Sequence, residues 1–224
     1  EKGYCVSGSD RVISPLAQSL QLAGATVFEG HRSENIQNPD VVVRSSAVKD
    51  DNPEVQAARN AGIPVLKRAE FLGQFMQEYT AIAVAGTHGK TTTTAMISWM
   101  LSAMGQDPSY IIGGVSKNLG NNAHSGRDGG FFVIEADEYD RMFIGLNPNL
   151  AVITNVQHDH PDCYPNPQIY QDAFFEFANR LKPGGTLVIC QDDPGAAKLG
   201  DSVEKQAGNI RLLRYTGDES GTLS

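Results

Sequence analysis

A glycine-flanked lysine stands where an apolar run gives way to a helical pattern, in the stretch AVAGTHGKTTTTAM that begins at Ala83. A strand, a glycine loop and a helix in this order aim several backbone N–H groups and the positive helix end at one point, where a phosphate can sit. Gly86 and Gly89 allow the backbone to approach phosphate oxygens. Lys90 can reach the terminal phosphates, and the Thr91 hydroxyl can bind Mg²⁺. The stretch therefore predicts a nucleotide site.

The loop differs from the general nucleotide-binding pattern GxxxxGK[ST]. Val84 stands where that pattern places its first glycine, and Gly86 lies only three residues before Gly89. A plain glycine-rich turn with an exposed lysine is the alternative interpretation. We prefer the nucleotide site because the strand, the loop, GKT and the helix coincide. Thr93 and Thr94 are expected only to satisfy backbone groups of the first helical turn.

A second apolar run ends in acidic residues, as a site for nucleotide and Mg²⁺ requires, because hard cations take oxygen ligands. In FFVIEADEYD, Glu135 ends the predicted strand and is the first candidate for a ligand of the metal or of its bound water. Asp137, Glu138 and Asp140 follow in the loop. The alternative interpretation of these residues is an acidic turn in contact with solvent.

A third apolar run, LAVITN, leads into the polar stretch VQHDHPDCY, at the kind of strand end where ligands of open α/β sheets collect. Taken alone, this stretch has the residue types of a zinc site, but its spacing is too tight for the usual ligand pairs. We expect Asp159 and His160 to face the phosphate and a second metal, and Asn155 to fix the loop geometry. For His158 and Cys163 a plain surface loop is the preferred interpretation.

Strands and helices alternate along the chain, which predicts an α/β fold with two Rossmann-like or P-loop domains, each built on a parallel sheet. The boundary is placed where a helix gives way to a fresh apolar strand, which gives domains at 1–79 and 80–224. The predicted strands are 4–10, 25–30, 40–48, 63–68, 81–86, 131–136, 150–155, 186–190 and 210–215. The predicted helices are 15–22, 53–60, 68–80, 90–104, 169–181 and 194–199, with a loop over 113–130.

Composition limits the class of protein. Of the 224 residues, 40% are hydrophobic and 20% are charged, which is enough for a buried core. A net charge of −8 without a basic run argues against a nucleic-acid surface, and the apolar runs are too short for membrane insertion. The 3 cysteines are scattered and form no metal pair, which is typical of a reducing compartment, so we expect a cytoplasmic location.

Taken together, these motifs resemble the Mur ligases of peptidoglycan synthesis. The motifs are GTHGKTTTT, the glycine pair at Gly113 and Gly114, EADEYDRMF and TNVQHDHPDCY, in this order. In the first half, VSGSD, PDVVVRSSAVKDDNPEV and AGIPVLKRAEFL resemble the N-terminal UDP-binding domain of the family. The resemblance covers nearly the whole chain. It leads us to expect that a glycine-rich strand and turn before Glu1, and a C-terminal domain after Ser224, are missing.

The resemblance implies an ATP-dependent ligase that joins a carboxylate to an amine. The muramyl carboxylate attacks the γ-phosphate of ATP to give an acyl phosphate, and the amine then displaces phosphate. By this resemblance the catalytic residues are Lys90 and His160, and the ligands of Mg²⁺ are Thr91, Glu135 and His160. The residues expected to bind ATP are Gly86, Thr87, His88, Gly89, Lys90, Thr91 and Thr92.

Within the family, the resemblance is to the members that join L-alanine to UDP-N-acetylmuramate, which are therefore the expected substrates. The compact segment between the acidic loop and the next strand favours L-alanine over the tripeptide that a recycling ligase of the family attaches. The residues expected to meet the UDP-muramyl substrate are Asp10, Ser45, Ser46, Asn118, Asn121, Asn122 and Arg127.

Two alternatives outside ligation stay open. A regulatory module would bind ATP and a UDP-sugar without any chemistry. A kinase for a small acceptor would give a stable phosphorylated product without an amine. The oligomeric state is left open by the sequence.

Overall fold

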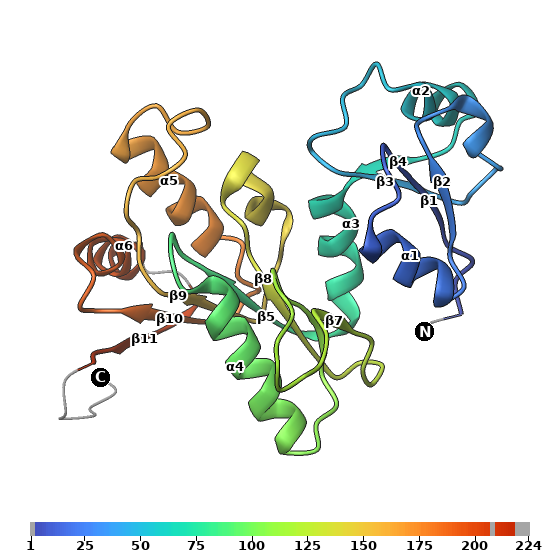
Figure 1. Cartoon of the computed structure of the whole chain (residues 1–224). Coiled ribbons are helices and arrows are strands. Elements are labelled where there is room, and N and C mark those ends of the chain that lie inside the picture. Colours follow the sequence, from blue (N-terminus) through green and yellow to red (C-terminus); the bar gives the residue numbers. More distant parts are fainter. Residues whose placement is uncertain (1–2, 207–208, 218–224) are drawn as a thin grey trace. The chain divides into compact units, whose positions relative to one another are not determined.

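The computed structural model describes residues 3–206 and 209–217, and its contacts divide the chain into two compact units (Figure 1). Unit 1 is Glu1–Phe71 and unit 2 is Leu72–Ser224. The expected domain boundary between residues 79 and 80 stays a prediction. The ends of the two expected domains include residues 1–2 and 218–224, which lie outside the described residues.

Unit 1 alternates short strands and short helices. Its elements are β1 (Ser7–Asp10), α1 (Pro15–Leu22), β2 (Thr26–Glu29), η1 (Ser33–Asn35), β3 (Val42–Arg44), α2 (Pro53–Asn60) and β4 (Val65–Lys67). Among the described residues, β1 pairs in parallel with β2, and β3 pairs in parallel with β4, as two separate pairs. Helices α1 and α2 each begin with a proline that follows a capping residue, Ser14 or Asn52. Proline is favoured at the first helical position because the N–H that it lacks has no acceptor within the helix there.

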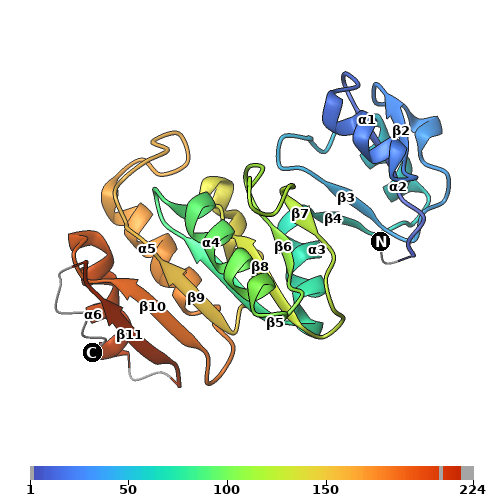
Figure 2. The same ribbon diagram turned by 60° about the horizontal axis from the view of Figure 1, so that its bottom comes forward.

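Unit 2 is built around one sheet (Figure 2). Its strands are β5 (Thr80–Ala85), β6 (Ser109–Ile111), β7 (Ala123–His124), β8 (Phe131–Glu135), β9 (Leu150–Ile153), β10 (Thr186–Cys190) and β11 (Arg211–Tyr215). In the described part of the chain they form a seven-stranded sheet in the order β11-β10-β9-β5-β8-β6-β7. All neighbours are parallel except β6 and β7. The carboxyl ends of the central strands β8, β5 and β9 therefore meet at one edge.

Helices cover both faces of this sheet, with α4 on one face and α5 on the other (Figure 1). Helix α3 (Arg68–Phe75) includes the boundary between the two units. The helical elements that follow it are η2 (Met76–Glu78), α4 (Lys90–Ala103), η3 (Tyr139–Gly145), α5 (Pro167–Ala178) and α6 (Pro194–Lys205). Successive residues of a strand point to opposite faces. Ala81 and Ala83 of β5 therefore pack in the core under α5 and α6, whereas Ile82 packs in the core under α4.

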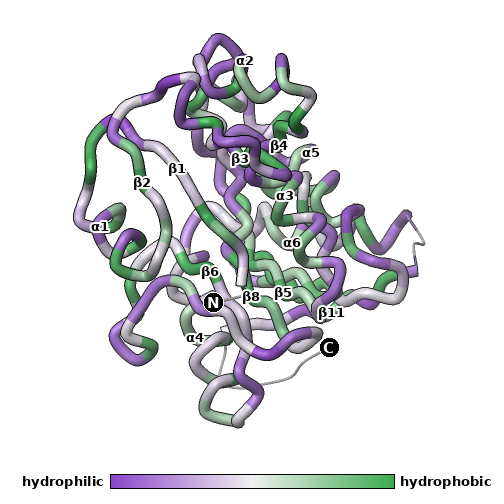
Figure 3. Tube along the Cα trace, turned by 90° about the vertical axis from the view of Figure 1, so that its right-hand side faces the viewer, coloured by the Kyte–Doolittle hydropathy of each residue, from purple (hydrophilic) through white to green (hydrophobic). Residues whose placement is uncertain are grey.

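The central strands are apolar along most of their length, and the green tube in Figure 3 marks this for β5 and β8. Every residue of β5 after Thr80 is buried. A strand that is buried on both faces has a continuous run of apolar residues. This is the pattern by which the sequence predicts β5 as a buried strand. The structure confirms the predicted α/β class with parallel sheets.

Several element bounds differ from the sequence expectations. The helix expected over 68–80 ends at Phe75 and continues as the 3₁₀ turn η2. Helix α5 begins earlier than expected, at Pro167, and α6 runs on to Lys205. The pair β6 and β7 was not expected, and β7 lies inside the predicted loop over 113–130. In the described part of the chain, every helix is too short or too polar to span a lipid bilayer.

Candidate functional site

The glycine loop lies at the carboxyl end of the central strand β5. Residues 86–89 join β5 to α4, and the register places Val84 opposite Glu135 of β8 and Ala85 opposite Ile153 of β9. The three polar stretches singled out in the sequence thus follow three neighbouring strand ends. Open α/β sheets bind their ligands at this edge.

The first turn of α4 is open to an anion. Its N-cap is Gly89, in a left-handed conformation with φ of 84°, and no side chain caps the helix. The first four N–H groups of a helix lack intrahelical acceptors, and an anion can accept their hydrogen bonds. By contrast, side chains cap α1, α2, α5 and α6, and the capping residues are Ser14, Asn52, Asn166 and Asp193.

The end of β9 holds the glycine loop in place. Gly86 has φ of 137°, and a Cβ atom there would lie 2.0 Å from Thr154 Oγ1, so no other residue type fits. The Thr154 hydroxyl donates to the carbonyl of His88 at 2.6 Å. The Asn155 side chain accepts from the His88 N–H at 2.9 Å and donates to its carbonyl at 3.0 Å. Asn155 therefore fixes the loop geometry, as expected.

Lys90 folds back over the loop instead of extending into solvent. Its Nζ donates to the Gly86 carbonyl at 2.8 Å and to Glu138 Oε1 at 3.0 Å, and it lies 2.8 Å from Glu138 Oε2. The Lys90 side chain is 13% exposed and the Glu138 side chain is fully buried. Glu138 is a site residue that the sequence reasoning did not select, because nothing in EADEYD distinguishes it from the neighbouring carboxylates.

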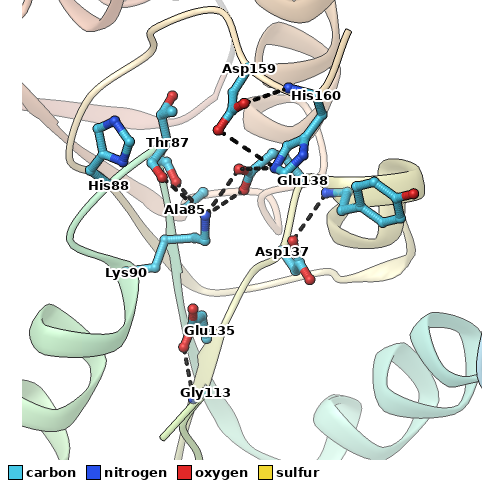
Figure 4. A network of polar contacts seen from close by, with 12 residues as sticks. Ala85, Thr87, His88, Lys90, Gly113, Glu135, Asp137, Glu138, Asp159 and His160 are labelled. Carbon is cyan, nitrogen blue, oxygen red and sulfur yellow. Dashed lines mark hydrogen bonds and ion pairs between the residues drawn. The ribbon is translucent and has the colours of Figure 1, made fainter. Parts of the chain in front are cut away.

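Two tyrosines fix Glu138 (Figure 4 shows its contact with Lys90). The Tyr164 hydroxyl donates to the Glu138 carbonyl at 2.5 Å, and the Tyr170 hydroxyl lies 3.4 Å from Oε1. Burial raises the pKa of Tyr164 to about 12, so this hydroxyl stays a donor. Tyr170 also lies 3.0 Å from the buried Thr87 hydroxyl. Within the described residues, Glu138 Oε2 has no partner in hydrogen-bond geometry, although the Lys90 ammonium lies close to it.

Glu135 and Thr91 come together as the sequence predicts. The Thr91 hydroxyl lies 3.0 Å from both carboxylate oxygens of Glu135, and the Gly113 N–H donates to Oε2 at 2.8 Å. A Cβ atom on Gly113 would lie 2.5 Å from Glu135 Oε2, so this close approach requires glycine. A hydroxyl and a carboxylate are oxygen ligands of the kind that Mg²⁺ takes beside phosphates and water. These two residues therefore fit a magnesium ion.

His160 contacts Glu138. Its Nε2 lies 3.6 Å from Glu138 Oε1 and 3.9 Å from Asp159 Oδ2, and in the view of Figure 4 Lys90 lies between the His160 ring and Glu135. The backbone of His160 is left-handed with φ of 52°, and its N–H donates to Asp159 Oδ1 at 2.7 Å. Among the described residues, no three His, Cys, Asp or Glu side chains form a group that could hold a metal by themselves.

Other residues of these stretches have structural contacts. His158 Nε2 lies 2.7 Å from the Tyr164 carbonyl oxygen, and the Cys163 thiol donates to Asp162. The Thr94 hydroxyl donates to the Lys90 carbonyl at 2.8 Å, which is the backbone contact expected for it. Thr92 is exposed on the first turn of α4.

The loop residues expected to meet a substrate lie at the surface or half-buried around β6 and β7, and three of them hold the loop. The Asn121 side chain accepts a hydrogen bond from the Tyr110 hydroxyl. The Asn122 carbonyl accepts from the Ile112 N–H at 2.8 Å, and the Arg127 N–H donates to the Asp107 carbonyl at 2.9 Å. The remaining residue, Asn118, is exposed.

Unit 1 has its own cavity of about 260 Å³, lined by residues of β1, β3 and the start of α2. Of the three residues expected here, Ser45 belongs to the lining, whereas Asp10 and Ser46 lie outside its described lining. Asp10 instead accepts from the Arg11 N–H at 2.6 Å. The lining includes Arg44, which the sequence reasoning did not select.

A polar cluster not expected from the sequence lines the same cavity. The Ser9 hydroxyl donates to Glu54 Oε2 at 2.6 Å and lies 2.9 Å from His31 Nδ1, and Asn35 Nδ2 donates to Glu54 Oε1 at 2.5 Å. Burial alone raises the pKa of Glu54, but the hydrogen bonds from Ser9 and Asn35 outweigh it and lower the pKa below its usual value. The cavity therefore contains an ionised carboxylate at neutral pH.

Two family models match the chain. The model described as Mur ligase middle domain matches residues 84–220. The model described as Mur ligase family, catalytic domain, matches residues 1–80. The two matches together take in almost all of the chain.

Curated relatives carry the name UDP-N-acetylmuramate–L-alanine ligase. The relative from Roseiflexus sp. is 45% identical over 210 residues, which are 94% of this chain and 45% of the relative. The relative from Myxococcus xanthus is 48% identical over 204 residues, which are 91% of this chain and 43% of the relative. The chain thus spans about half the length of the curated relatives it matches.

Solved structures are also similar. The UDP-N-acetylmuramate:L-alanyl-γ-D-glutamyl-meso-diaminopimelate ligase from Neisseria meningitides aligns with a TM-score of 0.84 and 30% identity, over 98% of this chain and 72% of that chain. The UDP-N-acetylmuramate-alanine ligase MurC from Thermotoga maritima aligns with a TM-score of 0.78 and 29% identity, over 97% of this chain and 47% of that chain.

Proposed function

Because the chain belongs to the Mur ligase family, we propose that it supplies the nucleotide site and the UDP-substrate site of an ATP-dependent ligase. The ligase joins L-alanine to UDP-N-acetylmuramate in peptidoglycan synthesis. The observation that carries this proposal is the Lys90 ammonium at the open start of α4, beside a strand end that presents Glu135 to Thr91. Relatives at 45% to 48% identity carry the name of this reaction.

The proposed mechanism uses this edge to neutralise spreading negative charge. The triphosphate of ATP lies along Gly86–Thr92 and accepts from the N–H groups of the uncapped first turn of α4, and Lys90 contacts the terminal phosphates. Thr91 and Glu135 would hold Mg²⁺, which would supply further positive charge at the phosphates. The muramyl carboxylate attacks the γ-phosphorus and ADP leaves, which gives an acyl phosphate. The amine of L-alanine then attacks the acyl carbon, and phosphate leaves.

His160 is proposed to act on the opposite side of Lys90, near a second Mg²⁺. Its support is its distance of 3.6 Å from the buried carboxylate of Glu138. An imidazole nitrogen and a carboxylate are both metal-ligand types. The backbone of His160 is left-handed, and its ring packs against the Tyr139 ring in a T-shaped contact with 5.1 Å between ring centres.

The cavity of unit 1 is proposed to bind the UDP part of the substrate. Its support is a volume of about 260 Å³ with both a cation, Arg44, and the polar cluster around Glu54 in its lining. Ser45 belongs to this lining, and Asp10 and Ser46 are proposed to contact the substrate at the same strand ends. The residues proposed to meet the muramyl part are Asn118, Asn121, Asn122 and Arg127. A cytoplasmic location is part of the proposal, because ATP and UDP-sugars are available there.

One alternative within the family has a specific observation in its favour. The Neisseria neighbour aligns with a TM-score of 0.84, and its name specifies a tripeptide in place of alanine. The two reactions are separated by offering L-alanine or the tripeptide to the natural gene product that carries these residues. Product formation with the tripeptide alone would replace the L-alanine proposal.

The test of the proposed function measures phosphate release and product mass with ATP, Mg²⁺, UDP-N-acetylmuramate and L-alanine. We expect Lys90→Ala to reduce phosphate release at least ~100-fold, because it removes a charge aimed at the transferring phosphoryl group. Lys198→Ala removes an exposed lysine of α6 and should leave the rate unchanged. Nucleotide binding without phosphate release would indicate a regulatory module. A phosphorylated product that accumulates without amine would indicate a kinase.

A further inference from the structure

Glu138 is a fully buried carboxylate inside the proposed nucleotide site. Its two oxygens lie 3.0 and 2.8 Å from the ammonium of Lys90, the group that the proposed function assigns to phosphate. A single ammonium cannot neutralise this carboxylate and a polyphosphate to the same extent. Because the contact is shielded from water, both the attraction to Lys90 and the repulsion of an incoming anion are strong.

The backbone of Glu138 is held in place, whereas the Lys90 ammonium stands at the end of a long side chain that can turn. The Arg141 N–H and the Tyr164 hydroxyl both donate to the Glu138 carbonyl, at 2.9 and 2.5 Å. The chain then turns sharply through two left-handed residues, Asp140 and Arg141. The Lys90 side chain has four methylene groups about which it can rotate, and it is 13% exposed. An exchange of partners therefore moves the lysine.

Glu138 also has unused capacity toward a cation. Oε2 has no partner in hydrogen-bond geometry within the described residues, and His160 Nε2 lies 3.6 Å from Oε1. A buried polar atom without such a partner is rare and calls for an explanation. A divalent cation beside Glu138 and His160 would supply the positive charge that Lys90 now supplies to the carboxylate.

We propose that Glu138 makes nucleotide binding dependent on a divalent cation. Glu138 holds the Lys90 ammonium until a divalent cation next to His160 replaces it as the counter-charge, and Lys90 then turns to the phosphates. The inference rests on the proposed function, because it concerns the same nucleotide site. In this proposal Glu138 positions the Lys90 ammonium. It also makes the affinity for nucleotide depend on the bound cation.

The test measures the dissociation constant of a non-hydrolysable ATP analogue by calorimetry, in Mg²⁺ and in EDTA, with the natural gene product. In EDTA we expect Glu138→Gln to bind the analogue about tenfold more tightly than the unmodified protein, because the competing carboxylate charge is gone. In the same variant, the ratio of the dissociation constant in EDTA to that in Mg²⁺ should decrease by a similar factor. Glu138→Asp withdraws the carboxylate from Lys90 and should change both values in the same direction but less.

Asp172→Asn is the matched control. It removes one negative charge from the exposed face of α5, the helix that carries Tyr170, and should leave both dissociation constants unchanged. Fluorescence of Trp99, the chain's 1 tryptophan, checks that each variant is folded. If the unmodified protein binds no analogue even with Mg²⁺, the proposed function fails. If it binds, and both Glu138 variants keep its full dependence on Mg²⁺, the coupling proposed here is wrong.

Discussion

At the scale of single residues, the contact between Lys90 and Glu138 affects both the stability of the fold and the binding of ligand. A buried charge that loses its partner destabilises a fold strongly, whereas removing both partners has a small effect. Glu138 is fully buried and Lys90 is 13% exposed, so the pair is close to the buried limit. The same contact that positions Lys90 therefore contributes to the free energy of unfolding of unit 2.

We expect Lys90→Met to reduce the free energy of unfolding of unit 2 by about 3 kcal/mol, because it leaves the buried Glu138 carboxylate without a counter-charge. The double variant Lys90→Met with Glu138→Gln should recover most of this loss. Urea unfolding followed by Trp99 fluorescence measures the effect, since Trp99 lies on α4. Equal destabilisation in the single and the double variant would show that the two side chains do not interact.

The sequence predicts site residues that belong to a recognisable local pattern. It does not predict a site residue whose contact depends on the conformation of a turn. Lys90 and Thr91 follow from the order of strand, glycine loop and helix, and Glu135 follows as the last residue of an apolar strand. Glu138 has the same residue type as Glu135 and lies three residues further on. Its burial depends on the left-handed turn after it, which no local pattern of side chains announces.

At the scale of elements, residues that cap helices also position the loops around the site. Asp193 caps α6 and also accepts from the Val156 N–H at 2.9 Å, so one carboxylate joins α6 to the chain that follows β9. Burial raises the pKa of Asp193, but the hydrogen bonds from the Val156 and Ala196 N–H groups, and from Gln157, outweigh it and lower the pKa. The folded state therefore favours the ionised form.

This shift predicts an acid dependence of stability. A carboxyl group whose pKa is lowered on folding, as for Asp193, stabilises the fold above its unfolded pKa, which is about 3.9 for an aspartate. It loses this contribution as the pH falls through the pKa of the folded state. We expect Asp193→Asn to reduce the free energy of unfolding by about 1–2 kcal/mol at pH 7. The difference from the unmodified chain should shrink below about pH 4.

Urea unfolding at a series of pH values between 7 and 3, followed by Trp99 fluorescence, measures this prediction. Asp172→Asn, which removes an exposed carboxylate from α5, is the control and should show no such convergence. A difference between Asp193→Asn and the unmodified chain that stays constant down to pH 3 would contradict the assignment of the charge to this cap.

The sequence predicts elements that have a local signal, such as a capping residue before a helix. It does not predict short strands that form only by pairing with a distant segment. A capping residue followed by proline marks the start of α1 and α2 at the expected residues, Pro15 and Pro53. β6 and β7 have three and two residues, and their pairing depends on Tyr110 meeting His124 across a long loop. A run this short has no periodicity from which a strand can be predicted.

At the scale of the whole molecule, the two units differ in how much apolar surface each of them buries. Among the described residues, unit 1 buries only a few apolar side chains, none of them aromatic, whereas unit 2 has a continuous core beneath α5 and α6. Burial of apolar area is the main stabilising contribution to folding. The buried apolar side chains of unit 1 are Ala17, Val55, Ala58 and Ile63.

Hydrogen exchange followed by mass spectrometry can test the units and their proposed ligands in one experiment. We expect amides of β1–β4 to exchange faster than those of β5, β8 and β9, because unit 1 has the smaller core. UDP should slow exchange around Ser9 and Ser45 of unit 1, and an ATP analogue with Mg²⁺ should slow it in the loop over residues 86–92. A ligand that binds the native state protects the amides of its own site. If UDP protects only unit 2, or the ATP analogue only unit 1, the assignment of the two sites to the two units is wrong.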